Sequence, residues 1–307
     1  MLNILSGIAI TSLMVALSIY LPFIGFFFSL FIPIPILYYR SMLGRSNGLT
    51  VLISTVFVLF VIMGGISVDK LYFFELMILG FILGEFLELN FSINKTVVYT
   101  CLVVFFTSIF GLTIFSAFTH ADINTLISEH VAKNIELTIE FYKEVGIQED
   151  AIYILSNSIE QIQYVMVRII PGVAIVLTLL VIWMNLLIAR PILAAKEIAN
   201  PAFKTLKLWK APEYLIWVLI GSGFLFLIPD TFIKVIGLNI LMILITIYFF
   251  QGIAIVSFFF QKKRFPMLLK IFLYLLIALQ QILVFVVVGL GLVDIWLNFR
   301  KIGLKNT

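Results

Sequence analysis

Charged residues are scarce in this sequence. They make up 12% of its 307 residues, whereas hydrophobic residues make up 63%. An average soluble domain has about 25% charged and about 45–50% apolar residues, because its water-facing surface must be polar. The composition therefore excludes a soluble globular protein. It indicates that a lipid bilayer surrounds most of the chain and is its main partner.

Residues that carry catalysis or bind metals are also few. The chain has one Cys and two His, which are too few ligands for the usual Cys and His metal sites. Cys101 lies in the apolar run VVYTCLVVFF, where we expect a small buried hydrophobic residue. No HExxH, GxSxG, P-loop or glycine-rich nucleotide motif occurs. We therefore predict that the protein is not an enzyme and uses no cofactor and no metal.

The long apolar runs are continuous rather than alternating, which favours transmembrane helices over barrel strands. Residues 1–39 contain no charge, and Leu21-Pro22 supplies a break between a first and a second helix. The expected fold is an all-α polytopic transmembrane bundle of about nine spans, within a range of eight to ten. The expected spans are residues 2–20, 23–38, 49–67, 71–88, 97–118, 164–189, 213–229, 235–260 and 266–290.

The basic residues predict the orientation of the chain rather than nucleic-acid binding, because most of them lie between the apolar runs and cytoplasmic loops are rich in Lys and Arg. With a cytoplasmic N-terminus, the inside loops contain eleven basic residues and the outside loops four. The eleven are Arg40, Arg45, Lys95, Arg190, Lys196, Lys204, Lys207, Lys210, Lys262, Lys263 and Arg264, and the four are Lys70, Lys133, Lys143 and Lys234. The N-terminal run has no basic residue before it, unlike a secretory signal, so we expect it to remain as the first span.

One long polar segment, residues 119–163, has eight acidic and two basic residues. Its apolar residues recur at helical spacing. They are Ile127, Val131, Ile135, Ile139 and Tyr142, and then Ile152, Leu155, Ile159 and Ile162. We predict an extracytoplasmic amphipathic helical hairpin that caps the bundle, the alternative being a mere link between spans. The hairpin separates a five-helix segment (1–118) from a segment of about four helices with an interfacial tail (164–307).

The end of the chain does not fit the alternation of spans. Residues 266–299 are too long for one crossing and too short for two. We expect a break at Gly289 and Gly291, followed by an interfacial helix. In that helix Asp294 is expected to interact locally with Arg300.

Charge within a span is costly and often functional, and three of the ionisable residues in the predicted spans are candidates: Glu75, Glu85 and Arg168. Glu75 and Arg168 lie near the outer boundary, so their side chains can reach the interface. Gly80 and Gly84 precede Glu85, and their spacing lets a second helix approach closely. This pattern predicts a packed polar seam that binds a cation or a partner. Glu85 and Glu88 lie three residues apart on one face of that span, and the alternative is that both already reach the headgroups.

Amide side chains within the later spans are candidate solute contacts. They are Asn185, Gln251, Gln280 and Gln281. In lipid an amide must find a partner, so the alternative for each is a hydrogen bond that joins two helices. A separate role is expected for Asp230, which follows Pro229 and should cap the next helix.

The order of segments resembles that of the YybS-like predicted membrane proteins, a bacterial family of unknown function. The resemblance rests on LPFIGFFFSLFIPIPILYYR after the first span, on the acidic insertion, and on GLNILMILITIYFFQGIAIVSFF and GLVDIWLNFRK. It covers nearly the whole chain and implies a protein of the bacterial inner membrane. The first six spans are similar in layout to the substrate-binding subunits of energy-coupling-factor vitamin transporters, and the layout is also similar to the rod-shape protein MreD.

Two functions follow from these similarities. In the vitamin transporters a small-residue face of the first helix docks on a coupling subunit, and Ala9, Ser12 and Ala16 would form that face here. The first hypothesis is therefore a transporter-like protein that binds a small solute, with a coupling subunit as a candidate partner. The alternative is a membrane scaffold or envelope-assembly protein without a solute pocket.

Overall fold

The computed structural model describes residues 2–21, 24–64, 68–146, 158–196, 198, 206 and 208–300. All regular structure in this part of the chain is helical, so the predicted all-α class is confirmed. The helices are α1 (Leu2–Tyr20), α2 (Ile24–Ser29), α3 (Pro33–Met63), α4 (Val68–Glu88), α5 (Ile93–Thr119), α6 (Ile123–Glu144), α8 (Ile159–Ala195), α9 (Leu215–Phe224), η2 (Leu225–Leu227), α10 (Thr231–Lys262), α11 (Met267–Leu279) and α12 (Gln281–Leu297).

The helices differ in their ability to cross a membrane. Within the described residues, five are long and apolar enough, or six if the bent pair α11 and α12 forms one span. α4 carries three glutamates, and α9 with η2 covers only Leu215–Leu227. A polytopic membrane protein is therefore shown, and the count of nine spans stays a prediction.

α3 consists of two helical pieces that fold back on each other. Gly44 has φ 80° and ψ 176°, a positive φ that glycine adopts readily. A Cβ on Gly48 would lie 2.8 Å from the Cα atom of Arg40, whereas residues eight apart in a straight helix are separated by about 12 Å. The chain therefore reverses at Gly44. The predicted second span falls on α2 and the first residues of α3, and the predicted third span falls on the part of α3 that follows Gly44.

The predicted break at Gly289 and Gly291 is wrong. The chain breaks at Gln280, where α11 and α12 meet at an angle of 102°. Both glycines lie inside α12, and a Cβ on Gly291 would lie 3.0 Å from the carbonyl carbon of Tyr248 on α10. Gly291 thus allows α12 to pack closely on α10, and the last turns of α12 belong to this contact rather than to a separate interfacial helix.

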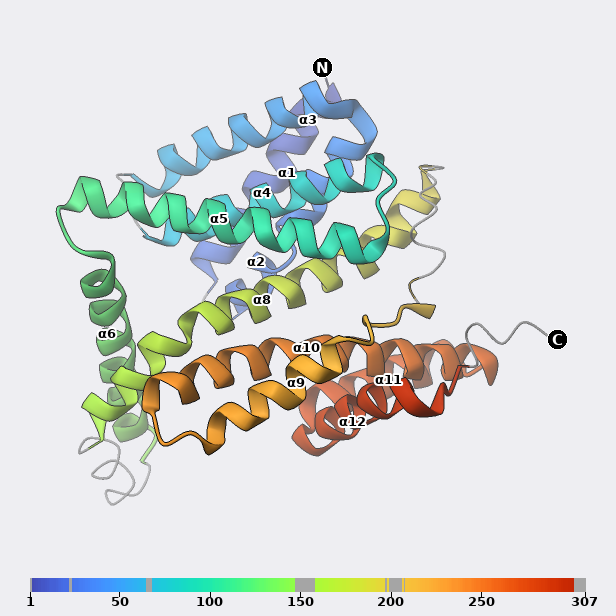
Figure 1. Cartoon of the computed structure of the whole chain (residues 1–307). Helices are drawn as coiled ribbons and strands as arrows, with labels where there is room; N and C mark the ends of the chain where they lie inside the picture. Colours follow the sequence, from blue (N-terminus) through green and yellow to red (C-terminus); the bar gives the residue numbers. More distant parts are fainter. Residues whose placement is uncertain are drawn as a thin grey trace.

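The long helices run lengthwise and α6 stands across one end of them (Figure 1). α5 packs on α8, and α8 packs on α10. The main apolar core lies among α1, α3, α4, α5 and α8, and a second core joins α10 to α9 and α12. α6 contacts the start of α8 and the end of α5.

The opposite end of the bundle, where α5 begins and α8 and α10 end (Figure 1), is called the basic end here. Described basic residues in or next to the segments that meet there include Arg40, Arg45, Lys95, Arg190, Lys196, Lys210, Lys262, Lys263, Arg264 and Arg300.

α6 confirms the first half of the predicted hairpin. Val131, Ile135 and Ile139 are buried on α6 and pack against a cluster that includes Ile159 and Ile162 of α8. The predicted second piece falls partly on Ile152 and Leu155, which lie outside the described residues.

Candidate functional site

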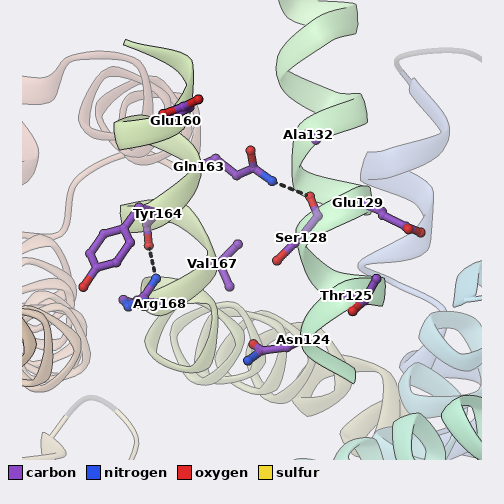
Figure 2. A pocket seen from close by; sticks show the side chains of 10 residues that line it. All are labelled: Asn124, Thr125, Ser128, Glu129, Ala132, Glu160, Gln163, Tyr164, Val167 and Arg168. Carbon is purple, nitrogen blue, oxygen red and sulfur yellow. Dashed lines mark hydrogen bonds between the residues drawn. The ribbon is translucent and has the colours of Figure 1, made fainter. Parts of the chain in front are cut away.

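A polar cleft lies between α6 and the first turns of α8 (Figure 2). Local sequence fixes both walls. Asp122 caps α6 by accepting a hydrogen bond from the N–H of Asn124 (3.1 Å). The apolar stripe of α6 packs on α8 and sets the distance between the helices. Glu160 lies in the first turn of α8, where its charge complements the helix dipole.

The cleft has a volume of about 740 Å³. Its walls are Asn124, Thr125, Ser128, Glu129, Ala132, Glu160, Gln163, Tyr164, Val167 and Arg168. Figure 2 shows Gln163 and Val167 pointing from α8 toward α6, and Gln163 donates a hydrogen bond to the carbonyl oxygen of Ser128 (3.1 Å). Arg168 stacks on Tyr164, with its guanidinium carbon 3.4 Å from the ring centre. It also donates a hydrogen bond to the Tyr164 carbonyl (3.0 Å).

The lining offers hydrogen-bond donors, acceptors and charges of both signs. The carboxylates of Glu129 and Glu160 accept, the Arg168 guanidinium donates, and the hydroxyl and amide groups do both. The volume falls within the roughly 300–1,000 Å³ of small-molecule sites. The cleft therefore suits a small polar solute. Among the described residues, no three His, Cys, Asp or Glu side chains lie close enough together to hold a metal ion.

α10 is joined to α8 directly beside the cleft. Pro171 interrupts α8 there and has no N–H to donate. The Oδ1 atom of Asn239 accepts a hydrogen bond from the N–H of Gly172 (2.6 Å), and its Nδ2 atom donates to the Arg168 carbonyl (3.1 Å). In a regular helix the 172 N–H and the 168 carbonyl are partners of each other. The Asn239 amide therefore inserts between these two backbone groups and replaces their direct hydrogen bond, in the turn of α8 that positions Arg168.

The three predicted intramembrane charges lie in three places. Arg168 lines the cleft, whereas Glu75 accepts a hydrogen bond from the Thr107 hydroxyl of α5 (2.7 Å). Glu85 forms an ion pair with Arg40 of α3 (2.5 Å). Arg40 is only 2% exposed and also pairs with Glu88. The cation that lies in the predicted polar seam is therefore the Arg40 guanidinium of this chain.

Gly80 and Gly84 lie at the same contact between α3 and α4. A Cβ on Gly80 would lie 2.8 Å from the Cα atom of Pro33, and one on Gly84 would lie 2.7 Å from the Cγ atom of Arg40. The two glycines therefore allow the close approach that brings the Arg40 guanidinium to the glutamates.

The predicted solute contacts do not come together in one site. Asn185 is fully buried and donates hydrogen bonds to the carbonyl oxygens of Leu30 (2.8 Å) and Val181 (2.7 Å). Gln280 and Gln281 are exposed at the bend between α11 and α12. Asn185 thus joins α8 to the turn after α2, as the alternative role predicted.

Gln251 belongs to a buried network at the end of α12. Its Oε1 atom accepts a hydrogen bond from the N–H of Ala211 (3.1 Å), and its Nε2 atom donates to Asp294 (3.2 Å). Asp294 pairs with Arg300 (2.8 Å), which confirms the predicted local contact. Arg300 also donates to the carbonyl of Trp209 (2.8 Å). Gln251 therefore joins helices and does not line the cleft.

The predicted docking face of α1 is partly covered by the chain itself. Ser12 and Ala16 are half-buried, and the Ser12 hydroxyl is shielded from solvent. Docking on a coupling subunit stays a prediction.

Sequence reasoning found α6 and Arg168 but missed the cleft between them. The available signal was the position of polar residues beside the buried stripe. Ser128 follows Ile127, and Gln163 follows Ile162, so each borders the helix contact. This signal identifies the border of an interface, but the width of the gap depends on tertiary packing.

A family model described as a predicted membrane protein, DUF2232, matches residues 9–295. The chain belongs to this family. The matched part of this DUF2232 protein includes both walls of the cleft and the whole of the bundle from α3 to α11. No curated protein and no solved structure matches the chain. The similarities to YybS-like proteins, vitamin-transporter subunits and MreD therefore stay predictions.

Proposed function

We propose that this DUF2232 protein is a solute-binding membrane protein of transporter type, and that the cleft between α6 and α8 holds its solute. The observation that carries the proposal is the cleft of about 740 Å³ with polar groups on both walls. Its solute is a small polar molecule, because charges of both signs and neutral hydrogen-bonding groups line the space. Binding and passage of such a solute break no bond, so the proposed activity is not enzymatic.

The position of the cleft supports this proposal. It lies at the end of the bundle opposite the basic end (Figure 1). Because basic residues favour the cytoplasmic side, we propose an inner-membrane protein with a cytoplasmic N-terminus and an extracytoplasmic cleft. A solute arriving from outside would meet α6 first. The predicted similarity in layout to vitamin-transporter subunits also favours a solute-binding function.

Thermal unfolding in the presence of candidate solutes tests the proposal. Purified protein is heated in neutral detergent with a panel of vitamins, nucleosides and amino acids, and the unfolding midpoint is measured. We expect at least one solute to raise the midpoint, because a ligand of the folded state stabilises it by mass action. Ala132→Trp, in the cleft wall, should abolish the shift, and Leu137→Trp should retain it, because Leu137 is exposed on α6 outside the cleft.

The proposal fails if no solute in the panel shifts the midpoint of the unaltered protein. It also fails if the Ala132→Trp and Leu137→Trp variants respond equally.

A scaffold function is the second candidate, and exposed apolar residues on α6 favour it. Leu137 and Phe141 are 53% and 52% exposed and lie four residues apart, on the side of α6 away from its buried stripe. A photo-crosslinking residue at 137 should then give one discrete adduct with an envelope protein in living cells. Crosslinks to lipid alone would contradict this second function.

A further inference from the structure

A second cavity lies near the basic end, far along α8 from the cleft. It has a volume of about 260 Å³ and is enclosed by α8, α10 and α11 together with Leu206. Most of its wall is apolar and includes Trp183 and Phe250. Three polar side chains also line it, namely Arg190, Ser257 and Tyr274.

The apolar wall is rigidly packed. Trp183 stacks on Phe250 with ring centres 5.1 Å apart, and its edge meets Trp209 at 4.7 Å. Trp183, Phe250 and Leu206 are all buried by the chain. Packing of this kind fixes the shape of the cavity on the side of α8 and α10.

α11 forms a much looser wall. Its one buried residue is Ile277, and it packs mainly on α12. Tyr274 reaches from α11 to the cavity, and its hydroxyl is hydrogen-bonded to Ser257 of α10. A chain-shaped ligand therefore has a lateral entry beside α11.

The guanidinium of Arg190 places a positive charge at the border of the cavity, and no carboxylate of the lining residues neutralises it. The guanidinium makes no ion pair or hydrogen bond within the described part of the chain, and no acidic residue lines the cavity. Acidic residues near the basic end are paired with other basic residues, Glu85 and Glu88 with Arg40, and Glu213 with Lys210. The exposed residues Lys262, Lys263 and Arg264 at the end of α10 add further positive charge. The polar edge is therefore complementary to an anion.

We infer that this cavity binds an anionic phospholipid, with part of one acyl chain against Trp183 and Phe250 and the phosphate at Arg190. A guanidinium pairs with phosphate in a bidentate, charge-assisted geometry. Basic pockets between transmembrane helices are suited to anionic headgroups. The volume of about 260 Å³ accommodates a segment of a chain rather than a whole lipid, so the rest of the lipid lies in the bilayer. This site is separate from the solute cleft and does not depend on it.

Tryptophan quenching tests the inference, because Trp183 lines the cavity and Trp209 packs against Trp183. The exposed Trp217 and Trp296 are first replaced by Phe. Delipidated protein in neutral detergent is then titrated with phosphatidylglycerol that carries brominated acyl chains, and separately with brominated phosphatidylcholine. We expect phosphatidylglycerol to quench at a lower concentration than phosphatidylcholine.

Charge and shape variants complete the test. Arg190→Gln should weaken phosphatidylglycerol binding about fivefold, the effect of one basic residue near an anionic lipid, and leave phosphatidylcholine unchanged. Lys263→Gln removes the same charge from an exposed position outside the cavity and should change binding much less. Ala254→Phe, which fills the cavity, should reduce quenching by both lipids.

Three results would overturn the inference. The first is equal quenching by the two lipids with no effect of Arg190→Gln. The second is an Ala254→Phe variant that is quenched like the parent protein. The third is a brominated fatty acid that binds as tightly as the phospholipid, because the ligand would then be a free carboxylate. None of these results bears on solute binding at α6, which is measured independently.

Discussion

Asp294 is a charged residue that is only 1% exposed, near the end of α12. Its carboxylate accepts hydrogen bonds from Gln251 (3.2 Å), from the N–H of Phe299 (2.9 Å) and from Arg300 (2.8 Å). A buried charge is tolerated only when its partners replace the lost water. The network therefore holds α12 to α10 only while both charges are present.

Removal of one charge should cost more than removal of both. We expect Asp294→Ala to lower the free energy of unfolding by about 3 kcal/mol, because it removes the carboxylate that is paired with a buried guanidinium. The double variant Asp294→Ala, Arg300→Ala should lose less than the sum of the two single changes. The measurement is unfolding by SDS in mixed micelles, followed by circular dichroism. As a control, the exposed pair Lys210–Glu213 should contribute at most about 1 kcal/mol, and additive losses at Asp294 and Arg300 would contradict the argument.

Residue-scale predictions from the sequence succeeded where the partners are close in the chain. Asp230 caps α10 by accepting a hydrogen bond from the N–H of Ile233 (2.9 Å), and Asp294 meets Arg300 six residues later. The partner of Glu85, in contrast, is Arg40, which lies 45 residues earlier. Such a pair depends on the packing of α3 on α4, and no local pattern contains that information.

At the scale of the element, the amphipathic helix α6 and the break between α1 and α2 were predictable, whereas the break between α11 and α12 was not. The helical spacing of apolar residues in α6 predicts the residues that are buried on it, namely Val131, Ile135 and Ile139. The break at Gln280 has neither Pro nor Gly, whereas Gly289 and Gly291 suggested a break and lie inside α12. Glycine serves both turns and close helix contacts, so its role follows only from the neighbouring helix.

The two glycines of α12 provide a matched pair for testing close packing. A Cβ on Gly291 would overlap the carbonyl group of Tyr248, whereas a Cβ on Gly289 would meet nothing within 4 Å. We expect Gly291→Ala to lower the free energy of unfolding by about 2 kcal/mol, the usual effect of overpacking. Gly289→Ala should leave it unchanged or raise it by up to about 1 kcal/mol, because Ala favours the helix. Equal effects of the two changes in SDS titrations would show that α12 does not pack on α10 in this way.

At the scale of the whole molecule, the ends of the bundle differ in charge. α6 carries four of the eight acidic residues of the insertion, and the basic end carries Arg190, Lys262 and Lys263. Composition and charge sufficed to predict a helical membrane protein with a polar cap. They did not predict that the cap leaves a cleft against α8, because the separation of two helices depends on how their side chains fit.

This charge asymmetry predicts which end faces the cytoplasm. In a Cys101→Ala background, Thr125→Cys places a thiol in the wall of the cleft, and Lys263→Cys places one at the basic end. Because Lys and Arg are retained on the cytoplasmic side, a membrane-impermeant maleimide should label the thiol at position 125 in intact spheroplasts. The thiol at position 263 should react only after the membrane is permeabilised. The reverse pattern would place the cleft inside the cell, and the proposed uptake of an external solute through α6 would then be impossible.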